Sequence, residues 1–217
     1  MQEYHKIQTV YKRDPATKHK TLLEGEFSLP IFDYLKDNQW VWTEKIDGTN
    51  IRVTYMPDAG DTPAGDPRVI FGGKTDNAQI PAKLVNKLQE LFPAEKFKDF
   101  DGPVTLYGEG FGASIQKGGG NYVPDGVDFI LFDVKIGPWW LEHKDVVDIA
   151  GKFGIKVVPI VGRGTLLKAV ERARPGFNST FGPFQAEGLV MRPAVGMNDR
   201  SGKRVIAKIK CKDFLHE

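Results

Sequence analysis

The chain has 217 residues, which is long enough to bury a substantial core and falls in the size range of one domain. Hydrophobic residues make up 41% of it, yet no apolar run approaches the roughly 20 residues that span a bilayer, so we expect no contact with a membrane. The formal net charge of +2 neither favours nor excludes a nucleic acid, because the placement of charge matters more than its sum.

The N-terminal residues and the cysteine content both favour a reducing compartment. Residues 1–6 lack the basic segment and apolar core of a secretory signal. Cys211 is the only cysteine, so no intramolecular disulfide can form, and we expect a cytoplasmic protein. Five basic residues before Glu24 form either an arm that contacts phosphates or a solvated surface: Lys6, Lys12, Arg13, Lys18 and Lys20.

Hydrophobic periodicity predicts several short strands and a few helices along one continuous domain, residues 1–217. Helices are expected at residues 81–92, where apolar residues recur at helical spacing, and at residues 146–153, ending near Gly154. A proline-rich loop is expected at residues 57–67. The predicted strands are residues 40–44, 51–55, 69–71, 104–107, 127–136, 157–161, 188–192 and 204–212. Because strands and helices do not alternate regularly, the pattern favours an α+β fold over a doubly wound sheet.

The sharpest local feature is a lysine at the end of a predicted strand, in the segment EKIDGTN at residues 44–50. Gly48 makes a tight turn easy directly after it, so the turn presents the amine of Lys45 at a rim. An ordinary polar hairpin would show the same composition. On this segment alone, both interpretations stay open.

The predicted strand at residues 204–212 places Lys208, Lys210 and Lys212 on one face, with apolar residues on the other. Such a row of ammonium groups can bind a triphosphate and neutralise charge that develops on phosphate oxygens. The alternative is an edge strand made soluble by lysines.

Two glutamates beside glycines supply the opposite charge, Glu109 and Glu187. At a strand margin, a carboxylate can hold Mg²⁺ directly or through water, or accept a hydrogen bond from a ribose hydroxyl. The glycines around Glu109 do not match the dinucleotide-binding fingerprint, so we reject a Rossmann fold. Phe129 can stack on a purine, although an aromatic in so apolar a strand is also typical of a core.

In order and spacing, five segments resemble the motifs of the covalent nucleotidyltransferase superfamily, which includes DNA ligases, RNA ligases and capping guanylyltransferases. They are KIDGTN (45–50), YGEGFG (107–112), FILFDV (129–134), EGLV (187–190) and KIK (208–210). Asn50 stands where DNA ligases and capping enzymes carry arginine, and is similar to the RNA ligase 2-like branch. The run IQKGG at residues 115–119 is also similar to that branch.

The resemblance implies a nucleotidyltransferase (adenylation) domain of antiparallel sheets flanked by helices. It implies an ATP-dependent RNA ligase in which Lys45 becomes covalently bound to AMP, the AMP passes to an RNA 5′-phosphate, and a 3′-hydroxyl displaces it. It also assigns the site residues. They are Glu44 facing adenine through its carbonyl or carboxylate, Asn50 and Glu109 at the ribose or the metal's water shell, Phe129 stacked on the base, Glu187 at the metal, and Lys208 and Lys210 at the phosphates.

The expected cofactors are ATP as substrate and Mg²⁺, with Mn²⁺ as a substitute. An ordinary lysine, with a pKa of about 10.4, carries little free amine at neutral pH, so the mechanism requires nearby cations and a metal ion. Where the superfamily often has an arginine between its first and third motifs, this chain offers Lys74 in FGGKT (71–75).

Only seven residues follow Lys210, so we expect no appended oligonucleotide-binding barrel and allow for an accessory RNA-binding partner. We expect a monomer. Two alternatives remain: a DNA ligase or GTP-dependent capping enzyme, which Asn50 disfavours, and a nucleotide- or RNA-binding module that forms no covalent adduct.

Overall fold

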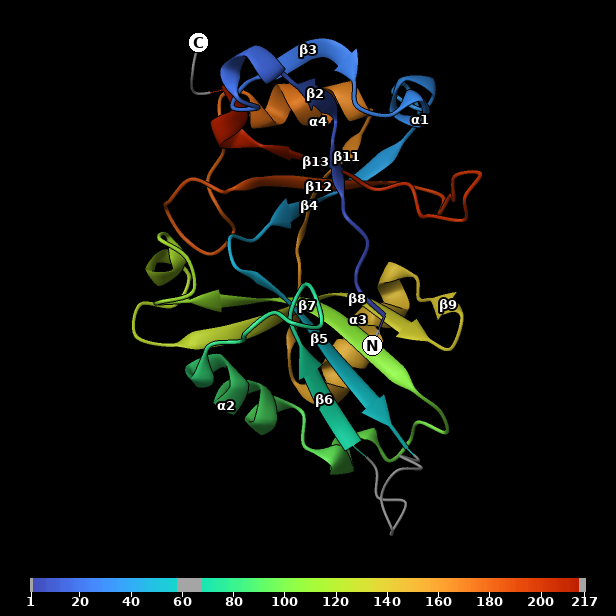
Figure 1. The fold of residues 1–217 in the computed structure, drawn as a ribbon, viewed down its shortest axis with the longest axis vertical. Helices are drawn as coiled ribbons and strands as arrows, with labels where there is room; N and C mark the ends of the chain where they lie inside the picture. The colour runs from blue at the N-terminus through green and yellow to red at the C-terminus, as the bar shows by residue number, and fades with distance from the viewer. Residues whose placement is uncertain (1, 58–67, 215–217) are drawn as a thin grey trace. The chain divides into compact units, whose positions relative to one another are not determined.

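The computed structural model describes residues 2–57 and 68–214, and its chain divides into two compact units (Figure 1). The first unit combines Asp47–Val158 with the N-terminal residues through Tyr4. The second combines His5–Ile46 with the residues from Pro159 onward. The chain therefore passes between the units three times, and one of these passages directly follows Ile46, the neighbour of Lys45.

The first unit contains a six-stranded sheet in the order β10-β8-β7-β5-β6, with β9 paired to β8. All neighbours are antiparallel except β10, which runs parallel to β8. The strands are β5 (Thr49–Met56), β6 (Arg68–Gly72), β7 (Val104–Gly112), β8 (Val127–Ile136), β9 (Trp139–Trp140) and β10 (Lys156–Val157). Its helices are α2 (Ala82–Leu91) and α3 (His143–Phe153), with the short 3-10 helices η2 (Ala94–Phe97) and η3 (Gly119–Asn121).

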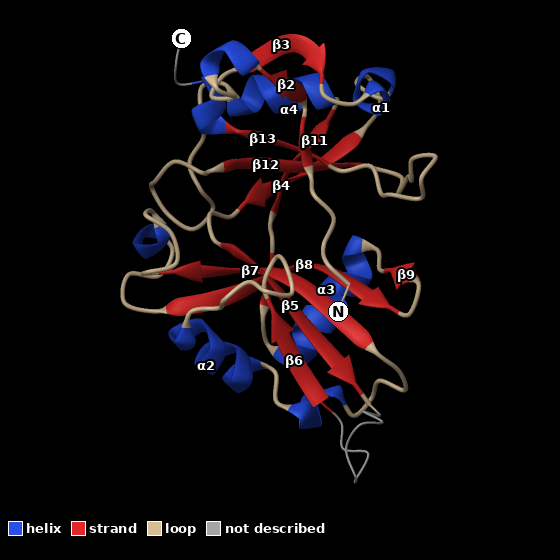
Figure 2. Ribbon diagram, viewed as in Figure 1, coloured by secondary structure: helices blue, strands red, loops and turns tan. Residues whose placement is uncertain are grey.

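Both long helices of this unit pack on one face of its sheet through a single apolar cluster. Leu84 and Leu88 of α2 and Phe153 of α3 lie in it together with Ile51 and Val53 of β5. The alternation of β5 sends these two residues toward the helices. Figure 2 shows the helices in blue beside the red strands.

The opposite side of β5 carries a buried arginine, Arg52, whose side chain is 0% exposed. Its Nε donates to the carbonyl of Gly73 at 2.7 Å, and its Nη2 donates to Asp76 Oδ1 at 2.9 Å. Since a buried guanidinium needs such partners, Arg52 fixes the loop that follows β6.

The second unit contains a five-stranded sheet in the order β1-β13-β12-β4-β11 and a two-stranded ribbon, β2-β3. The sheet strands are β1 (Gln8–Thr9), β4 (Trp40–Lys45), β11 (Ile160–Gly164), β12 (Gly188–Pro193) and β13 (Ala207–Lys210). The ribbon is β2 (Tyr11–Arg13) and β3 (Leu22–Phe27). The helices are α1 (Pro30–Tyr34) and α4 (Leu166–Ala173), with the 3-10 helices η1 (Pro15–Thr17) and η4 (Cys211–Phe214).

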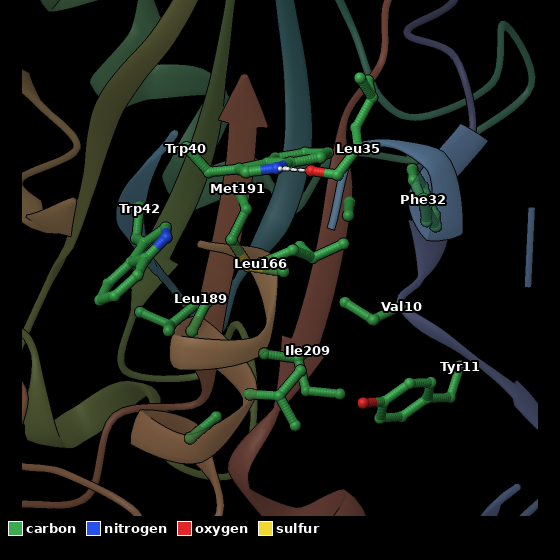
Figure 3. Packing of buried hydrophobic residues seen from close by; sticks show 14 of the residues in the cluster. Val10, Tyr11, Phe32, Leu35, Trp40, Trp42, Leu166, Leu189, Met191 and Ile209 are labelled. Carbon is green, nitrogen blue, oxygen red and sulfur yellow. Dashed lines mark hydrogen bonds between the residues drawn. The ribbon is translucent and has the colours of Figure 1, made fainter. Parts of the chain in front are cut away.

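The core of this unit lies on one face of the five-stranded sheet (Figure 3). Trp40 and Trp42 of β4 lie there with Leu189 of β12 and Ile209 of β13. Trp40 Nε1 donates to the carbonyl of Leu35 at 2.9 Å, which satisfies the one polar group of a fully buried ring. Because side chains alternate along a strand, Lys45 lies on the opposite face from the two tryptophans.

Gly188 lies where β12 approaches β13 most closely. A Cβ built on it would lie 2.1 Å from the carbonyl oxygen of Ile209 and 2.7 Å from Lys210 Cα. No side chain fits there without moving backbone atoms. A glycine is therefore required at this position for the two strands to pair as they do.

The α+β class, the antiparallel sheets and the helices at residues 81–92 and 146–153 are confirmed. Helix α4 was missed, although the Thr165 side chain accepts from Lys168 N as an N-cap and apolar residues recur at helical spacing after it. The proline-rich loop predicted at residues 57–67 lies, apart from its first residue, outside the described residues. The assignment of residues 1–217 to one domain stays a prediction.

Three strand predictions are wrong in their extent. The strand predicted at residues 104–107 continues to Gly112 as β7. Residues 157–161 belong to two strands of different sheets, since β10 pairs with β8 and β11 pairs with β4. The chain changes units at Pro159, which has no N–H for a ladder. Residues 204–212 form a strand only over Ala207–Lys210. A 3-10 helix follows, where Asp213 Oδ2 accepts from Lys210 N at 3.3 Å and Asp213 Oδ1 pairs with Arg13 at 2.8 Å.

In the described part of the chain, no helix has both the length and the apolar character needed to cross a membrane.

Replacing Arg52 with Met is expected to lower the free energy of unfolding by about 2 to 4 kcal/mol, because the Gly73 carbonyl loses its buried donor. Urea denaturation measures this. Arg68→Met, an exposed arginine on the neighbouring strand β6, is the matched control and should change stability by less than about 0.5 kcal/mol. Equal effects of the two substitutions would contradict a structural role for the buried guanidinium.

Replacing Gly188 with Ala is expected to cost about 2 to 4 kcal/mol of stability, because the new methyl group meets the β13 backbone. Gly196→Ala is the control, since a Cβ there meets no atom within 4 Å. Thermal unfolding of both variants checks this, and a stable Gly188→Ala protein would show that β12 and β13 can separate at no cost.

Candidate active site

Three strands of the second unit bring the candidate nucleophile into register with a lysine from the far end of the chain. Gly188 of β12 pairs with Lys45 of β4 on one side and with Lys210 of β13 on the other. Residues directly opposite each other in a sheet point to the same face. The two lysines therefore share the face opposite the core, two strand spacings or about 9.6 Å apart along the sheet.

The carboxylate of Glu187 lies between these two lysines. Its Oε1 pairs with Lys210 Nζ at 2.6 Å, and its Oε2 accepts a hydrogen bond from Lys45 Nζ. The Glu187 side chain is 9% exposed, and the two lysine side chains are 20% and 22% exposed. Each oxygen of the Glu187 carboxylate thus contacts one ammonium group. With two lysines and one carboxylate, the cluster has a formal charge of +1.

The backbone around Glu187 is fixed by the residue that follows Lys210. Cys211 N donates to the Glu187 carbonyl at 2.9 Å. Burial raises the pKa of the Cys211 thiol, so this cysteine stays a neutral, buried group. Its contribution to the site is therefore positional.

Lys208 lies on the same face as Lys210, two residues earlier on β13, opposite Val190 of β12. Lys212 does not join this row. It lies in the 3-10 helix η4 and is exposed. The lysine row predicted from alternation therefore has two members on β13, with Lys45 beside them.

The Glu44 side chain lies on the core side of β4, opposite to Lys45, and is fully engaged. Its carboxylate accepts from Ser179 Oγ at 2.5 Å, from Thr180 N at 2.9 Å and from Thr180 Oγ1 at 2.6 Å, and Glu44 is 1% exposed. These bonds tie the loop before β12 to the strand that carries Lys45. Of the two Glu44 groups that the resemblance offered to adenine, only the backbone carbonyl remains a candidate.

In the first unit, Asn50 of β5 lies directly opposite Glu109 of β7. Asn50 Oδ1 is buried and has no hydrogen-bond partner among the described residues. Gly48 packs closely against β7, since a Cβ on it would lie 2.3 Å from the Gly110 carbonyl oxygen. Directly after this turn, β5 thus places a buried amide oxygen opposite the residue Glu109 of β7.

Phe129 and Lys74 also belong to the first unit. Phe129 is 1% exposed, and its ring meets Phe92 edge-on with centroids 5.2 Å apart. This placement favours the core alternative that the sequence left open, and stacking on a base stays an untested prediction. Lys74 is exposed in the loop that Arg52 anchors.

The predicted site residues thus fall into two groups, one in each unit. The second unit holds Glu44, Lys45, Glu187, Lys208 and Lys210, and the first holds Asn50, Lys74, Glu109 and Phe129. Within residues 2–57 and 68–214, no three His, Cys, Asp or Glu side chains gather as a metal cage. Mg²⁺ does not need one, since it is usually held by one or two carboxylates and substrate phosphates.

Sequence reasoning missed Arg52, Ser179 and Thr180. Arg52 could have been found, because a charged residue between two apolar strand residues, Ile51 and Val53, needs a partner if it is buried. Ser179 and Thr180 gave no local signal, since they lie 135 and 136 residues from Glu44.

The fold matches solved structures of the RNA ligase of Naegleria gruberi. An apo mutant of that protein aligns with a TM-score of 0.65 and 19% identity, over 98% of this chain and 58% of its own. A mutant with ATP and Mn aligns with a TM-score of 0.63 and 20% identity, over 83% and 52%. A mutant with AMP and Mn aligns with a TM-score of 0.63 and 20% identity, over 96% and 57%.

This chain therefore spans just over half the length of those structures, and at this identity the likeness concerns the fold. A comparison with curated proteins gave no match. The sequence matches the RNA ligase family over residues 38–210, a segment that runs from before Lys45 to Lys210. The chain belongs to the RNA ligase family.

Proposed function

We propose that this chain is the adenylation domain of an ATP-dependent RNA ligase, with Lys45 as the nucleophile that becomes bound to AMP. The observation that carries the proposal is the cluster of Lys45, Glu187 and Lys210 across three paired strands. Such a cluster combines a nucleophilic amine with a second cation that can neutralise charge on phosphate oxygens. Membership of the RNA ligase family supports the same assignment.

In the first step, Lys45 Nζ loses a proton to solvent and attacks the α-phosphorus of ATP. An N–P bond forms while the bond from that phosphorus to the β-phosphate oxygen breaks, and pyrophosphate leaves. Lys45 is bound to Glu187 in the resting site, so this contact must open before the amine can react. Lys210 and Lys208 lie on the same face and would neutralise the charge on the phosphates.

In the second step, an oxygen of an RNA 5′-phosphate attacks the phosphorus of the lysyl-AMP, and the N–P bond breaks. In the third, a 3′-hydroxyl attacks the 5′-phosphate, a phosphodiester forms and AMP leaves. The phosphoramidate on Lys45 keeps AMP activated between these steps. ATP and RNA with 5′-phosphate and 3′-hydroxyl ends are the proposed substrates.

Two positions fit a divalent cation or its bound water. In the first unit, the orphaned Asn50 Oδ1 and the neighbouring Glu109 carboxylate offer hard oxygen ligands. In the second, Glu187 becomes available once its lysines turn to phosphate. A bound Mg²⁺ or Mn²⁺ would offset negative charge on the triphosphate.

The test is to mix the protein with α-labelled ATP or GTP and MgCl₂, and to follow label on the denatured protein. Wild type should become labelled from ATP and lose the label on addition of pyrophosphate. Lys45→Ala should lose labelling by at least about 1,000-fold, because no other amine replaces the nucleophile. Glu187→Gln should label about 10- to 100-fold more slowly, since one carboxylate that orders two lysines is neutralised.

Lys168→Ala, an exposed lysine on α4, is the matched control and should label like wild type. No label on wild type, or undiminished label on Lys45→Ala, would rule out the mechanism. Label from GTP alone would redirect the function to capping, which is the alternative that Asn50 disfavours.

A further inference from the structure

The second unit contains a cavity of about 220 Å³ away from Lys45, which we call the basic pocket. Its lining combines four basic side chains with an apolar floor that includes Leu29 and Phe32. The basic residues are His5, Lys6, Lys203 and Arg204. Two segments distant in sequence therefore place positive charge around an apolar surface that a third segment supplies.

A tight turn before β13 builds one wall of the basic pocket. Asp199 N donates to the Lys203 carbonyl at 2.7 Å, and Lys203 N donates to Asp199 Oδ1 at 3.0 Å. Ser201 N and Oγ donate to the same oxygen at 2.8 and 2.7 Å. Arg204 then forms a β-bridge with Asn198. The turn is ordered by its own hydrogen bonds and holds Lys203 and Arg204 in place.

The charge of this pocket is unbalanced. Among the residues that the structure describes, Asp199 is the only acidic one that lines the pocket, and its Oδ1 accepts hydrogen bonds within the turn. Hydrogen bonds from Ser201 and Lys203 hold the pKa of Asp199 below its ordinary value, so it does not titrate near neutral pH. In the described ranges, no salt bridge is made by Lys6 or Lys203.

The basic residues before Glu24 differ in their surroundings. Lys12 pairs with Glu26 at 3.2 Å, and Arg13 pairs with Asp213 at 2.8 Å. Lys6 instead lines the basic pocket. The arm is therefore partly structural, and Lys6 is the member that faces a cavity.

An exposed aromatic lies close to the pocket along helix α1. Tyr34 is 83% exposed and follows Ile31, a lining residue, by three positions, so the two are neighbours on the helix surface. An exposed tyrosine beside a cluster of cations is the combination that proteins use to bind single-stranded nucleic acid, with stacking on bases and charge on phosphates.

The basic pocket lies at the edge strand β1, which pairs with β13, the strand that carries Lys208 and Lys210. Gln8 lines the pocket and pairs with Ala207 on the core face of β13, whereas the next residue, Lys208, points to the opposite face. Arg204 precedes Lys210 by six residues, which span at most about 21 Å when fully extended. A few nucleotides of a single strand can cover that distance.

We propose that the basic pocket binds a phosphate and a base of the single-stranded RNA whose end reacts at Lys45, with Tyr34 stacking on a neighbouring base. This inference rests on the proposed function, since it takes RNA as the substrate. In this arrangement Lys6, Lys203 and Arg204 contact the RNA backbone, and Tyr34 contacts a base without regard to sequence.

The test uses the full chain and a fluorescein-labelled, 5′-phosphorylated single-stranded RNA of about 12 nucleotides, with binding followed by fluorescence anisotropy over a salt series. The double variant Lys6→Gln/Lys203→Gln should bind about tenfold more weakly, and the slope of log K against log salt should fall by about 1.4 because two phosphate contacts are lost. Tyr34→Ala should bind at least about fivefold more weakly.

The matched control is Lys20→Gln/Lys168→Gln, which removes two exposed lysines of the same unit that do not line the pocket. It should bind RNA like wild type. All variants should become labelled with ATP like wild type. If the pocket variants are labelled normally and also bind RNA like wild type, this inference is wrong and the proposed function is unaffected. The inference is also wrong if Lys6→Gln/Lys203→Gln weakens the binding of heparin as much as that of RNA and Tyr34→Ala has no effect on RNA binding. The pocket would then be a general anion site.

Discussion

The carboxylate of Glu187, held between the ammonium groups of Lys45 and Lys210, is the interaction that organises the candidate active site. It exists because Gly188 pairs with both lysines at once, one on each neighbouring strand. That pairing in turn requires the absence of a side chain on Gly188. The close packing at Gly188 thus determines the strand register, and the register determines which charges meet in the site. Trp40 and Trp42, buried on the other face of β4, hold the strand that carries Lys45 in the sheet.

Much of this arrangement could be predicted from the sequence, because short motifs carry both chemistry and local conformation. A strand that alternates apolar and basic residues must send Lys208 and Lys210 to one face, and the glycine after Lys45 must allow a turn. The sequence could not supply the register between β4, β12 and β13, since those strands lie more than 140 residues apart at their extremes. Only the fold brings Glu187 between its two lysines.

The errors have physical causes. The lysine row was extended to Lys212 because alternation does not reveal that Asp213 draws the chain into a 3-10 turn. Residues 157–161 read as one strand because Pro159, where the chain changes units, is flanked by β-branched residues. The contacts of the Glu44 carboxylate with Ser179 and Thr180 could not be read from the sequence either, and the contact of the Glu44 carbonyl with adenine stays a prediction. In each case the pattern of neighbouring residues does not show what the fold decides, which is a turn of the chain, a change of unit or a partner distant in sequence.

The way Glu187 divides its two oxygens between two lysines has a consequence for what the site can select. A ligand with a single anionic oxygen can replace only one of these contacts and leaves the other lysine bound to Glu187. A group that presents several anionic oxygens, such as a phosphoryl group, can engage both ammonium groups and free the carboxylate. The resting ion pairs therefore favour anions with several charged oxygens over a single-atom anion such as chloride, before any contact with a base or a sugar is made.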